Sequence, residues 1–515
     1  MAIENKNQLK FERCAIMKKL LIFTCMLLNS GFDVIGQDTF SILHHKNTNR
    51  LNILDTISLP FEISKEKQLS KEDILNKKEG FFITGLPRFE FDPIRGFGVG
   101  GNVFLFQNKT EEDPFFYYTP YRYSVNTEFF VFENGRIKAA VNLDVPYVFG
   151  SKWRLRVDAV LWEDPNAQYW GIGRESLNRL QFTDKSEGAD GPIRQFNRVA
   201  AYENNLRIAV PGNGGRLHTD THFNQFIQKE KLFNFLGERV EMGGKLRIMF
   251  GYEMLFTAFE DYTGRIAEEA FLANGTAVEA IQRPTLANIQ KNDGTWERFN
   301  LAGFQDRFQF TSMLAGALIY DTRDLEPDPS KGVFLQYSHE YSAPWIGSEF
   351  NFNKFMVQGQ FIHTFHRWKN DRNRLTFAGL AAFGHIWGPK INFIEMWDLS
   401  SQAEAGGILV LGGGRSLRGY REARFLAPTV GLVNLEMRAR LHDFNALNQH
   451  FALGITPFYD FGTVWEGLSD VQLNNFRGAP GIGGRIAWNQ STILRLDYAQ
   501  SREGGQFFFG FGHIF

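Results

Sequence analysis

The stretch that decides the fold class is Gln506-Phe507-Phe508-Phe509-Gly510-Phe511-Gly512-His513-Ile514-Phe515. A water-soluble protein rarely exposes so aromatic a terminus. In a membrane β-barrel, a closing strand points alternate side chains at lipid and at the lumen. We expect the lipid and interface set to be Phe507, Phe509, Phe511 and Phe515, and the lumenal set to be Gly510 and Gly512. This terminus therefore favours an all-β transmembrane barrel over a soluble β-sandwich.

Four other segments alternate with a period of two, which is the repeat of a β-strand. Each has one apolar face and one charged or polar face, and they are 123–131, 137–145, 153–161 and 435–441. A soluble sandwich also alternates in this way, so the pattern alone predicts strands. Together with the aromatic terminus, it predicts a transmembrane antiparallel β-barrel.

The composition agrees with that fold. There are 52 Phe, 50 Gly and 15% aromatic residues, which suits many short strands with aromatic belts. Helical membrane proteins need repeated apolar runs of about 20 residues, and one apolar run stands out here, near the N-terminus. The formal net charge is −1, so the chain offers no strongly basic surface for nucleic acid and we expect no nucleic-acid partner.

The N-terminal run has the features of a secretory signal. Met17-Lys18-Lys19 forms the basic part, residues 20–28 form the apolar part, and cleavage after Gly36 would leave Gln37 as the mature start. The alternative, a short membrane anchor, is disfavoured because the apolar part is too short to span a bilayer. Both cysteines, Cys14 and Cys25, precede the expected cleavage point, so we expect neither disulfides nor thiol chemistry in the mature protein.

The expected organisation has three parts. Residues 1–36 are an upstream extension and signal peptide, residues 37–87 are a short polar periplasmic leader, and residues 88–515 are the outer-membrane barrel. Strands are expected to begin near Phe97. Longer polar stretches at 173–198, 260–306 and 389–414 interrupt the alternation, and we expect them to be long extracellular loops.

The most informative motif is Leu-Gly-Gly-Gly-Arg-Ser-Leu-Arg-Gly-Tyr-Arg at residues 411–421. Its glycines could cradle a phosphate, but no Gly-Lys-Ser/Thr follows and no strand–helix context surrounds them. The stretch instead resembles the signature of the long sixth loop in the BamA/TamA family of outer-membrane assembly and translocation barrels, also called the bacterial surface antigen family. The terminal Phe515 and four further segments are similar to family signatures in the family's order: 169–173, 320–332, 431–438 and 457–465.

The resemblance implies a barrel of sixteen strands, with the long extracellular loop folded back into the lumen. Residues 88–515 leave room for sixteen strands of about ten residues with generous loops. In the family, an arginine of that loop contacts an acidic residue on an inner strand face. By position these residues are Arg418 and Asp460.

The alternation of the strands supports this pair independently. If the apolar residues from Phe451 to Phe461 face lipid, Asp460 faces inward, and Glu436 faces inward on its own strand. Gly419 lets the loop backbone turn, and Tyr420 can pack beside it. A buried guanidinium needs a carboxylate partner, so we favour an Arg418–Asp460 contact over an Arg418 solvated in a wet lumen. Such a pair would be a structural lock and not a catalyst.

Two further motifs follow from the resemblance. Asp321, Arg323 and Asp324 are similar to a strand–turn signature, and the terminal residues Phe511 and Phe515 to the signal that marks the end of such barrels. The acidic residues near Asp324 also suggest calcium, but turn-forming Asp beside prolines explains them more simply. No nucleophile–base pair or paired carboxylates stand out, so we expect no enzymatic activity, no cofactor and no metal.

One departure from the family concerns the leader. Well-studied members carry periplasmic modules of about 75 residues each, and residues 37–87 are too few for one module and a linker. The chain is therefore expected to be a barrel-only member. The favoured function is assisting insertion or translocation of polypeptide or lipid through a seam between the first strand, 97–106, and the last, 507–515. The alternatives are a passive or partner-gated channel and a structural subunit or surface antigen of an envelope complex. The expected partners are outer-membrane lipid, unfolded client proteins and other envelope proteins of a Gram-negative bacterium.

Overall fold

The computed structural model describes fifteen stretches of the chain. They are residues 58–64, 68–69, 74, 77–92, 96–183, 193–205, 207–209, 217–219, 222–263, 284–324, 328–368, 373–397, 410–446, 449–488 and 492–515. The predicted signal peptide and most of the predicted leader lie outside the described residues.

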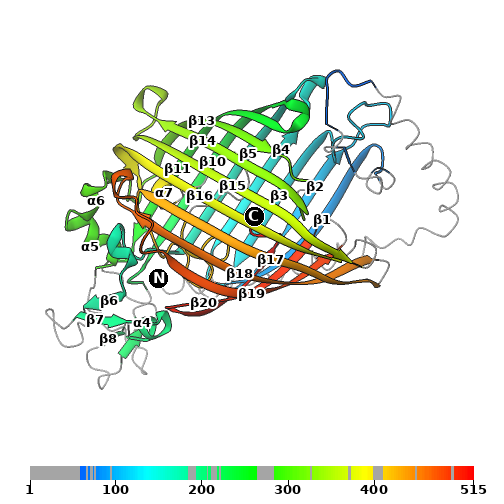
Figure 1. Cartoon of the computed structure of the whole chain (residues 1–515). Coiled ribbons are helices and arrows are strands. Elements are labelled where there is room, and N and C mark those ends of the chain that lie inside the picture. Colours follow the sequence, from blue (N-terminus) through cyan, green and yellow to red (C-terminus); the bar gives the residue numbers. More distant parts are fainter. Residues whose placement is uncertain are drawn as a thin grey trace, which may run out of the picture.

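The described residues form one dominant antiparallel sheet (Figure 1). It contains seventeen strands, of which two-residue β12 (Leu301–Ala302) adds only a short parallel pairing to β16. The other strands pair with their neighbours in chain order: β1 (Phe81–Asp92), β2 (Gly96–Gln107), β3 (Tyr123–Phe132), β4 (Ile137–Val145), β5 (Trp153–Gln168), β10 (Gln225–Glu241), β11 (Leu246–Asp261), β13 (Gln309–Asp321), β14 (Lys331–Ser342), β15 (Asn351–Trp368), β16 (Asn373–Asn392), β17 (Thr429–Ala446), β18 (Gln449–Trp465), β19 (Arg477–Trp488), β20 (Thr492–Ser501) and β21 (Gly504–Phe511).

These sixteen long strands confirm the predicted all-β antiparallel fold. The first and last strands, β1 and β21, lie beside each other, with Cα atoms within 8 Å. Within the described residues, no helix is both long enough and apolar enough to cross a membrane.

Alternation of side chains explains why these segments form strands with two different faces. On β18, Leu453, Ile455 and Tyr459 are exposed, whereas Thr456 and Asp460, which directly follow Ile455 and Tyr459, are buried. On β21, Phe507 and Phe509 are exposed. Outward apolar and inward polar side chains are the pattern of a barrel whose outer surface meets lipid. The four alternating segments identified in the sequence lie in β3, β4, β5 and β17.

The start of the barrel differs from the prediction. The first strand is β1, which begins at Phe81, inside the segment assigned to the leader and before residue 88. β1 pairs along its full length with β2, from Phe81 opposite Gln107 to Asp92 opposite Gly96. The glycine-rich strand from Phe97 is therefore the second strand and not the first. β1 contains Gly85 and Pro87 in its interior, residue types that are uncommon inside strands, so the sequence pattern does not mark it as a strand.

The long connections gather at one end of the sheet, called the loop end here; the opposite end is the turn end. The described residues of connections 169–224, 262–308 and 393–428 include the short elements seen on the left of Figure 1. Two of the predicted extracellular loops, 260–306 and 389–414, begin within β11 and β16, and residues 184–192, 264–283 and 398–409 of the three loops lie outside the described residues. These elements are β6 (Leu180–Thr183), β7 (Ile193–Phe196), α4 (Val199–Asn205), β8 (Arg207–Ala209), β9 (Leu217–Thr219), α5 (Leu286–Asn292), α6 (Thr295–Arg298) and α7 (Phe393–Trp397). Single 3₁₀ turns are η3 (Val148–Gly150), η4 (Arg174–Leu177), η6 (Met242–Gly244), η7 (Pro344–Ile346) and η8 (Leu468–Asp470).

The main hydrophobic core lies at the loop end, where side chains from the connections pack against inward-facing strand residues. Its centre, called the aromatic cluster below, is Tyr169, Phe226, Phe259, Trp296, Phe304 and Phe393. The rings of Trp296 and Phe393 stack with centroids 4.8 Å apart. The Trp296 indole N–H donates to the Tyr169 hydroxyl over 2.9 Å. The loops therefore fold inward into a packed cluster.

The described part of the leader is attached to the turn end. The Lys77 ammonium donates to the carbonyl of Thr119 over 2.7 Å and to the carbonyl of Phe116. The N–H of Ser64 donates to the carbonyl of Gly243 in the β10–β11 turn over 2.7 Å. The described residues of the leader thus contact the β2–β3 connection and the β10–β11 turn.

Candidate functional site

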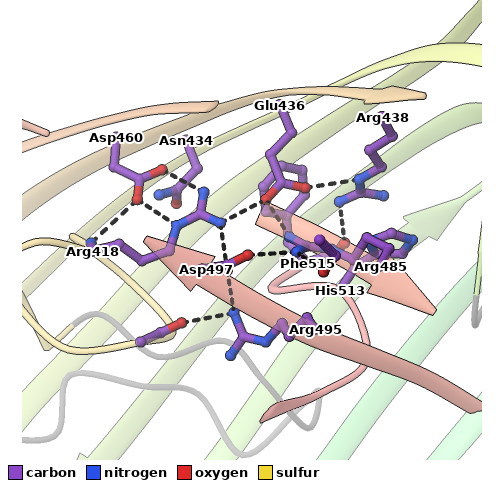
Figure 2. Close-up of polar contacts among 12 residues, drawn as sticks. Arg418, Asn434, Glu436, Arg438, Asp460, Arg485, Arg495, Asp497, His513 and Phe515 are labelled. Carbon is purple, nitrogen blue, oxygen red and sulfur yellow. Dashed lines mark hydrogen bonds and ion pairs between the residues drawn. The ribbon is translucent and has the colours of Figure 1, made fainter. Parts of the chain in front are cut away.

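The centre of the candidate site is the guanidinium of Arg418, which is fully buried. Its Nε donates to Oδ2 of Asp460 over 2.7 Å, and its Nη2 donates to Oδ1 over 2.8 Å (Figure 2). The main-chain N–H of Arg418 also donates to Oδ2, over 3.2 Å. Two parallel N–H···O bonds fix orientation as well as position. Asp460 therefore holds the loop against β18 at one angle.

Two further carboxylates receive the remaining N–H groups of Arg418. Nη1 donates to Oε1 of Glu436 over 2.9 Å and to Oδ2 of Asp497 over 3.0 Å. The ring of Phe458 covers the guanidinium, with its centroid 3.3 Å from Cζ. The structure therefore brings Arg418, Asp460 and Glu436 together, and it adds Asp497, which the sequence analysis did not identify.

Three more arginines extend the cluster along the wall of the barrel. Arg438 donates to Oε2 of Glu436 over 2.8 Å, and Arg495 donates to Oδ2 of Asp497 over 3.2 Å. Arg485 also pairs with Asp497. The set is called the charge network below: Arg418, Glu436, Arg438, Asp460, Arg485, Arg495 and Asp497. It contains four guanidinium groups and three carboxylates.

The strands place these side chains inward by their alternation. Glu436 and Arg438 are two residues apart on β17, and Arg495 and Asp497 are two residues apart on β20, so each pair shares a face. Between them, β19 contributes glycines where its neighbours need room. A Cβ at Gly483 would lie 2.0 Å from Oδ1 of Asp497 and 2.3 Å from Nη1 of Arg485. A Cβ at Gly481 would lie 2.1 Å from the ring of Phe458, which covers Arg418. The glycines of β19 therefore make the space that the charge network fills.

The loop around Arg418 is held by its own backbone and by packing. Gly419 has φ of 91°, a left-handed conformation that favours glycine. A Cβ there would lie 3.1 Å from Cβ of Ala479 on β19. Tyr420 is buried, and its ring meets that of Phe425 edge to face with centroids 5.0 Å apart. Gly419 therefore lets the loop turn, and Tyr420 packs within the same loop against Phe425.

Arg424 is a second anchor of the same loop, which the sequence analysis missed. Its Nε donates to Oε2 of Glu503 over 3.0 Å. Its Nη1 and Nη2 donate to the carbonyls of Ser176 and Asn178 over 2.6 and 3.0 Å. This buried arginine ties the long loop to the first long connection and to the β20–β21 hairpin. The only signal in the sequence was its position shortly after the glycine-rich motif.

The strand–turn residues Asp321, Arg323 and Asp324 lie at the turn end, away from Arg418. Arg323 Nε donates to Oδ1 of Asp321 over 3.0 Å. The main-chain N–H of Ser330 donates to Oδ1 of Asp324 over 2.8 Å. Burial opposes ionisation of Asp324, but its hydrogen bonds with Ser330 outweigh burial, and its pKa lies below the ordinary value. These carboxylates organise the turn between β13 and β14.

The end of the chain also differs from the prediction. Phe511 is the last residue of β21, opposite Leu494. Gly512 has φ of 74°, and the chain turns there away from the strand direction. Phe515 was expected in lipid or at the interface, but its ring lies 5.0 Å from Cζ of Arg438 and packs against the main core. The left-handed glycine explains the error, because it ends the alternation on which the expectation rested.

His513 occupies the turned-in segment beside the strand–turn motif. Its Nε2 lies 3.2 Å from Oδ1 of Asp328. Burial, with a further contribution from Arg438, lowers the pKa of His513 to about 4. The segment is also held by Arg438, whose Nη2 donates to the main-chain oxygen of Phe515 over 3.0 Å.

Chemically, this arrangement can hold a loop and a chain end in fixed places. A guanidinium remains protonated under all ordinary conditions. The carboxylates of Asp460, Glu436 and Asp497 each accept hydrogen bonds from arginine. The site therefore acts through directional ionic contacts between the loop and strands β17–β20.

The fold and the site together define a class: outer-membrane-type β-barrels whose lumen holds a long loop fixed by arginine. Residues 272–515 match the Omp85 superfamily domain. This part of the chain is thus similar to the Omp85 superfamily domain, and the resemblance inferred from the motifs is confirmed. Residues 59–122 match a domain of unknown function (DUF5982). That match includes part of the leader together with β1 and β2, so it crosses the boundary expected at residue 88.

Solved structures that are similar to the chain are distant in sequence. BamA from Haemophilus ducreyi lacking POTRA domains 1–3 has 11% identity and a TM-score of 0.45, over 84% of this chain and 70% of that one. CdiB from Escherichia coli has 8% identity and a TM-score of 0.44, over 82% and 58%. CdiB from Acinetobacter baumannii has 10% identity and a TM-score of 0.41, over 84% and 60%.

Proposed function

We propose that the protein resides in the outer membrane of a Gram-negative bacterium and assists the insertion or translocation of polypeptide through a lateral seam between β1 and β21. It works without a cofactor and without enzymatic catalysis. Its partners are outer-membrane lipid and unfolded client proteins. The Omp85 superfamily domain over residues 272–515 supports this class of function.

One observation carries the proposal: the unequal lengths of the two strands at the seam. β1 has 12 residues, whereas β21 has 8 and is the shortest of the sixteen long strands described. The chain then leaves the sheet at Gly512. A strand edge longer than its neighbour offers backbone N–H and C=O groups for pairing with another chain. The seam is therefore the place where an incoming strand can be templated.

The filled lumen favours this route over a solute channel. The aromatic cluster packs the loop end, and the charge network fixes the long loop to the wall. A conducting pore would need the aromatic cluster and the long loop to move out of the lumen. The channel alternative keeps one supporting observation, since charged side chains line the inner face of β17–β20.

The test is a reversible lock on the seam. Cysteine pairs are introduced between β1 and β21, and the protein is reconstituted in liposomes with an unfolded outer-membrane protein as client. We expect the oxidised lock to abolish accelerated folding of the client, and reductant to restore it. The matched control is a pair at Val103 and Thr127, which lie opposite each other on the paired strands β2 and β3.

Two outcomes contradict the proposal. If the locked seam accelerates client folding as well as the unlocked protein does, the lateral route is wrong. If the wild-type protein conducts ions strongly in planar bilayers and Arg418→Ala changes that conductance without altering client folding, the channel reading replaces it.

A further inference from the structure

A small cavity lies between the charge network and the turned-in chain end. It has a volume of about 40 Å³, is partly open, and is lined by residues of β16–β20 together with Asp328 and His513. One water molecule needs roughly 10–15 Å³ by the same measure. The cavity therefore has space for about three water molecules or one compact oxyanion.

Several polar atoms of the residues that line this cavity have no hydrogen-bond partner. Nη1 of Arg438, and Nε and Nη2 of Arg485, are buried without a hydrogen-bond partner among the protein atoms. The same holds for Oγ1 of Thr456 and Nδ1 of His513. Arg438, Arg485 and Thr456 are each more than nine-tenths buried. Three cationic N–H groups and one hydroxyl thus belong to the lining of one cavity, and a buried donor without an acceptor is costly.

The surrounding charges favour a negatively charged acceptor. The charge network has four guanidinium groups for three carboxylates. Asp460 is taken up by Arg418, whereas Glu436 is shared with Arg438 and with Arg485, the latter at 3.7 Å. The one carboxylate on the cavity wall, Asp328, is paired with Arg374 at 2.6 Å and with His513. An anion entering the cavity therefore meets guanidinium N–H groups and a carboxylate that is already paired.

We propose that this cavity is a binding site for one oxyanion of the phosphate type. Arg438 and Arg485 supply charged donors to its oxygens, and Thr456 supplies a hydroxyl. Charge-assisted hydrogen bonds of this kind are about twice as strong as neutral ones. The bound anion would join β17, β18 and β19 to the segment after β21, so occupancy stabilises the inward position of the chain end. The proposal does not depend on the transport activity proposed above.

The experiment measures inorganic phosphate binding by the full chain in detergent, by calorimetry and by the shift in unfolding temperature. Sodium chloride at equal ionic strength is the reference for general screening. We expect Arg438→Gln to weaken phosphate binding by about tenfold or more, since it removes charged hydrogen bonds. Thr456→Val, which removes only the hydroxyl, weakens it by a smaller factor.

The matched control is Arg477→Gln. Arg477 also has a buried Nε without a partner, but its Nη2 donates to the carbonyl of Leu177 at the loop end, and it does not line the cavity. Arg477→Gln should bind phosphate as the wild type does. If Arg438→Gln does not fold, the phosphate affinity of Thr456→Val alone tests the proposal.

Three results overturn the proposal. Chloride could stabilise the protein as much as phosphate does, Thr456→Val and Arg438→Gln could bind phosphate with unchanged affinity, or Arg477→Gln could weaken binding as much as Arg438→Gln. A parallel titration with short-chain phosphatidic acid separates sources of the same chemistry. Tighter binding of that lipid than of inorganic phosphate assigns the site to a lipid headgroup, and equal or weaker binding assigns it to a free anion.

Discussion

Two regions hold the long loop inside the barrel, and they do so by different physics. At the loop end, rings from several connections form the aromatic cluster, in which Phe393 meets Phe226, Phe259, Trp296 and Phe304. On the wall of β17–β20, one arginine meets three carboxylates. Apolar contacts are non-directional and shared among many residues, whereas the three ionic contacts between the loop and β17, β18 and β20 all pass through Arg418. The aromatic cluster should therefore tolerate change, and the charge network should not.

The largest expected effect comes from Arg418→Ala. It leaves three buried carboxylates without their common partner, and breaking a buried pair in this way costs about 3–5 kcal/mol. The free energy of unfolding, from urea titration in detergent, should fall by that amount. Arg421→Ala is the control, since Arg421 lies in the same loop but pairs with Glu203 in a partly exposed position. Equal losses in both variants would mean that the network is not what holds the loop.

Acid should weaken the charged region before it weakens the aromatic one. The pKa of His513 is lowered by burial from 6.5 to about 4. Between these values the unfolded chain takes up a proton that the folded chain does not, so stability falls as pH falls from about 6.5 to 4. One pKa unit corresponds to about 1.4 kcal/mol, and the whole window to about 3 kcal/mol.

Urea titrations at pH 7 and pH 4.5 on the wild type and on His513→Asn measure this loss. The asparagine variant has no titrating ring, so its stability should change less between the two pH values. If both proteins lose the same stability, the acid sensitivity belongs to other groups.

Gly419→Ala tests the backbone of the loop separately from its charges. A left-handed conformation costs a residue with a Cβ about 1–2 kcal/mol, and the new Cβ would also press on Ala479. We expect a destabilisation of that size with the Arg418 contacts retained. Glycine 413, which also has positive φ but 3.5 Å or more of clearance, provides a comparison: Gly413→Ala should cost less.

The smallest effect is expected for Phe393→Leu in the aromatic cluster. The substitution keeps an apolar side chain among many neighbours, and such changes usually cost under about 1.5 kcal/mol. The free energy of unfolding and the heat-dependent gel mobility of the folded barrel should change little. A loss as large as that of Arg418→Ala would reverse the comparison between the two regions.

The sequence predicted the architecture because the barrel depends on alternation, which is a local property. The period placed Asp460 and Glu436 inward before any contact was known, and the glycine-rich motif marked the loop that bears Arg418. The sixteen long strands follow from the family resemblance and agree with the structure.

The sequence could not predict contacts between residues that are distant in the chain and meet only inside the barrel. Asp497 and Arg495 lie on β20, and nothing local to them indicates that a loop arginine meets them. The glycines of β19 were a usable signal, because small residues in a strand mark places where neighbours come close. The first strand was missed because Gly85 and Pro87 lie inside β1, and the chain end was misplaced because Gly512 ends the alternation of β21.

The glycines of β2 have one more consequence. The rings of Phe130 and Phe132 on β3 occupy the positions that side chains at Gly98 and Gly100 would take, at 2.8 Å or less. Rings from β3 therefore cover the face of the β1–β2 hairpin that its own glycines leave bare. A bulkier residue at Gly98 or Gly100 would push the β1–β2 hairpin away from β3. Such a variant would loosen the first hairpin while the residues of β1 and β21 at the seam stay unchanged.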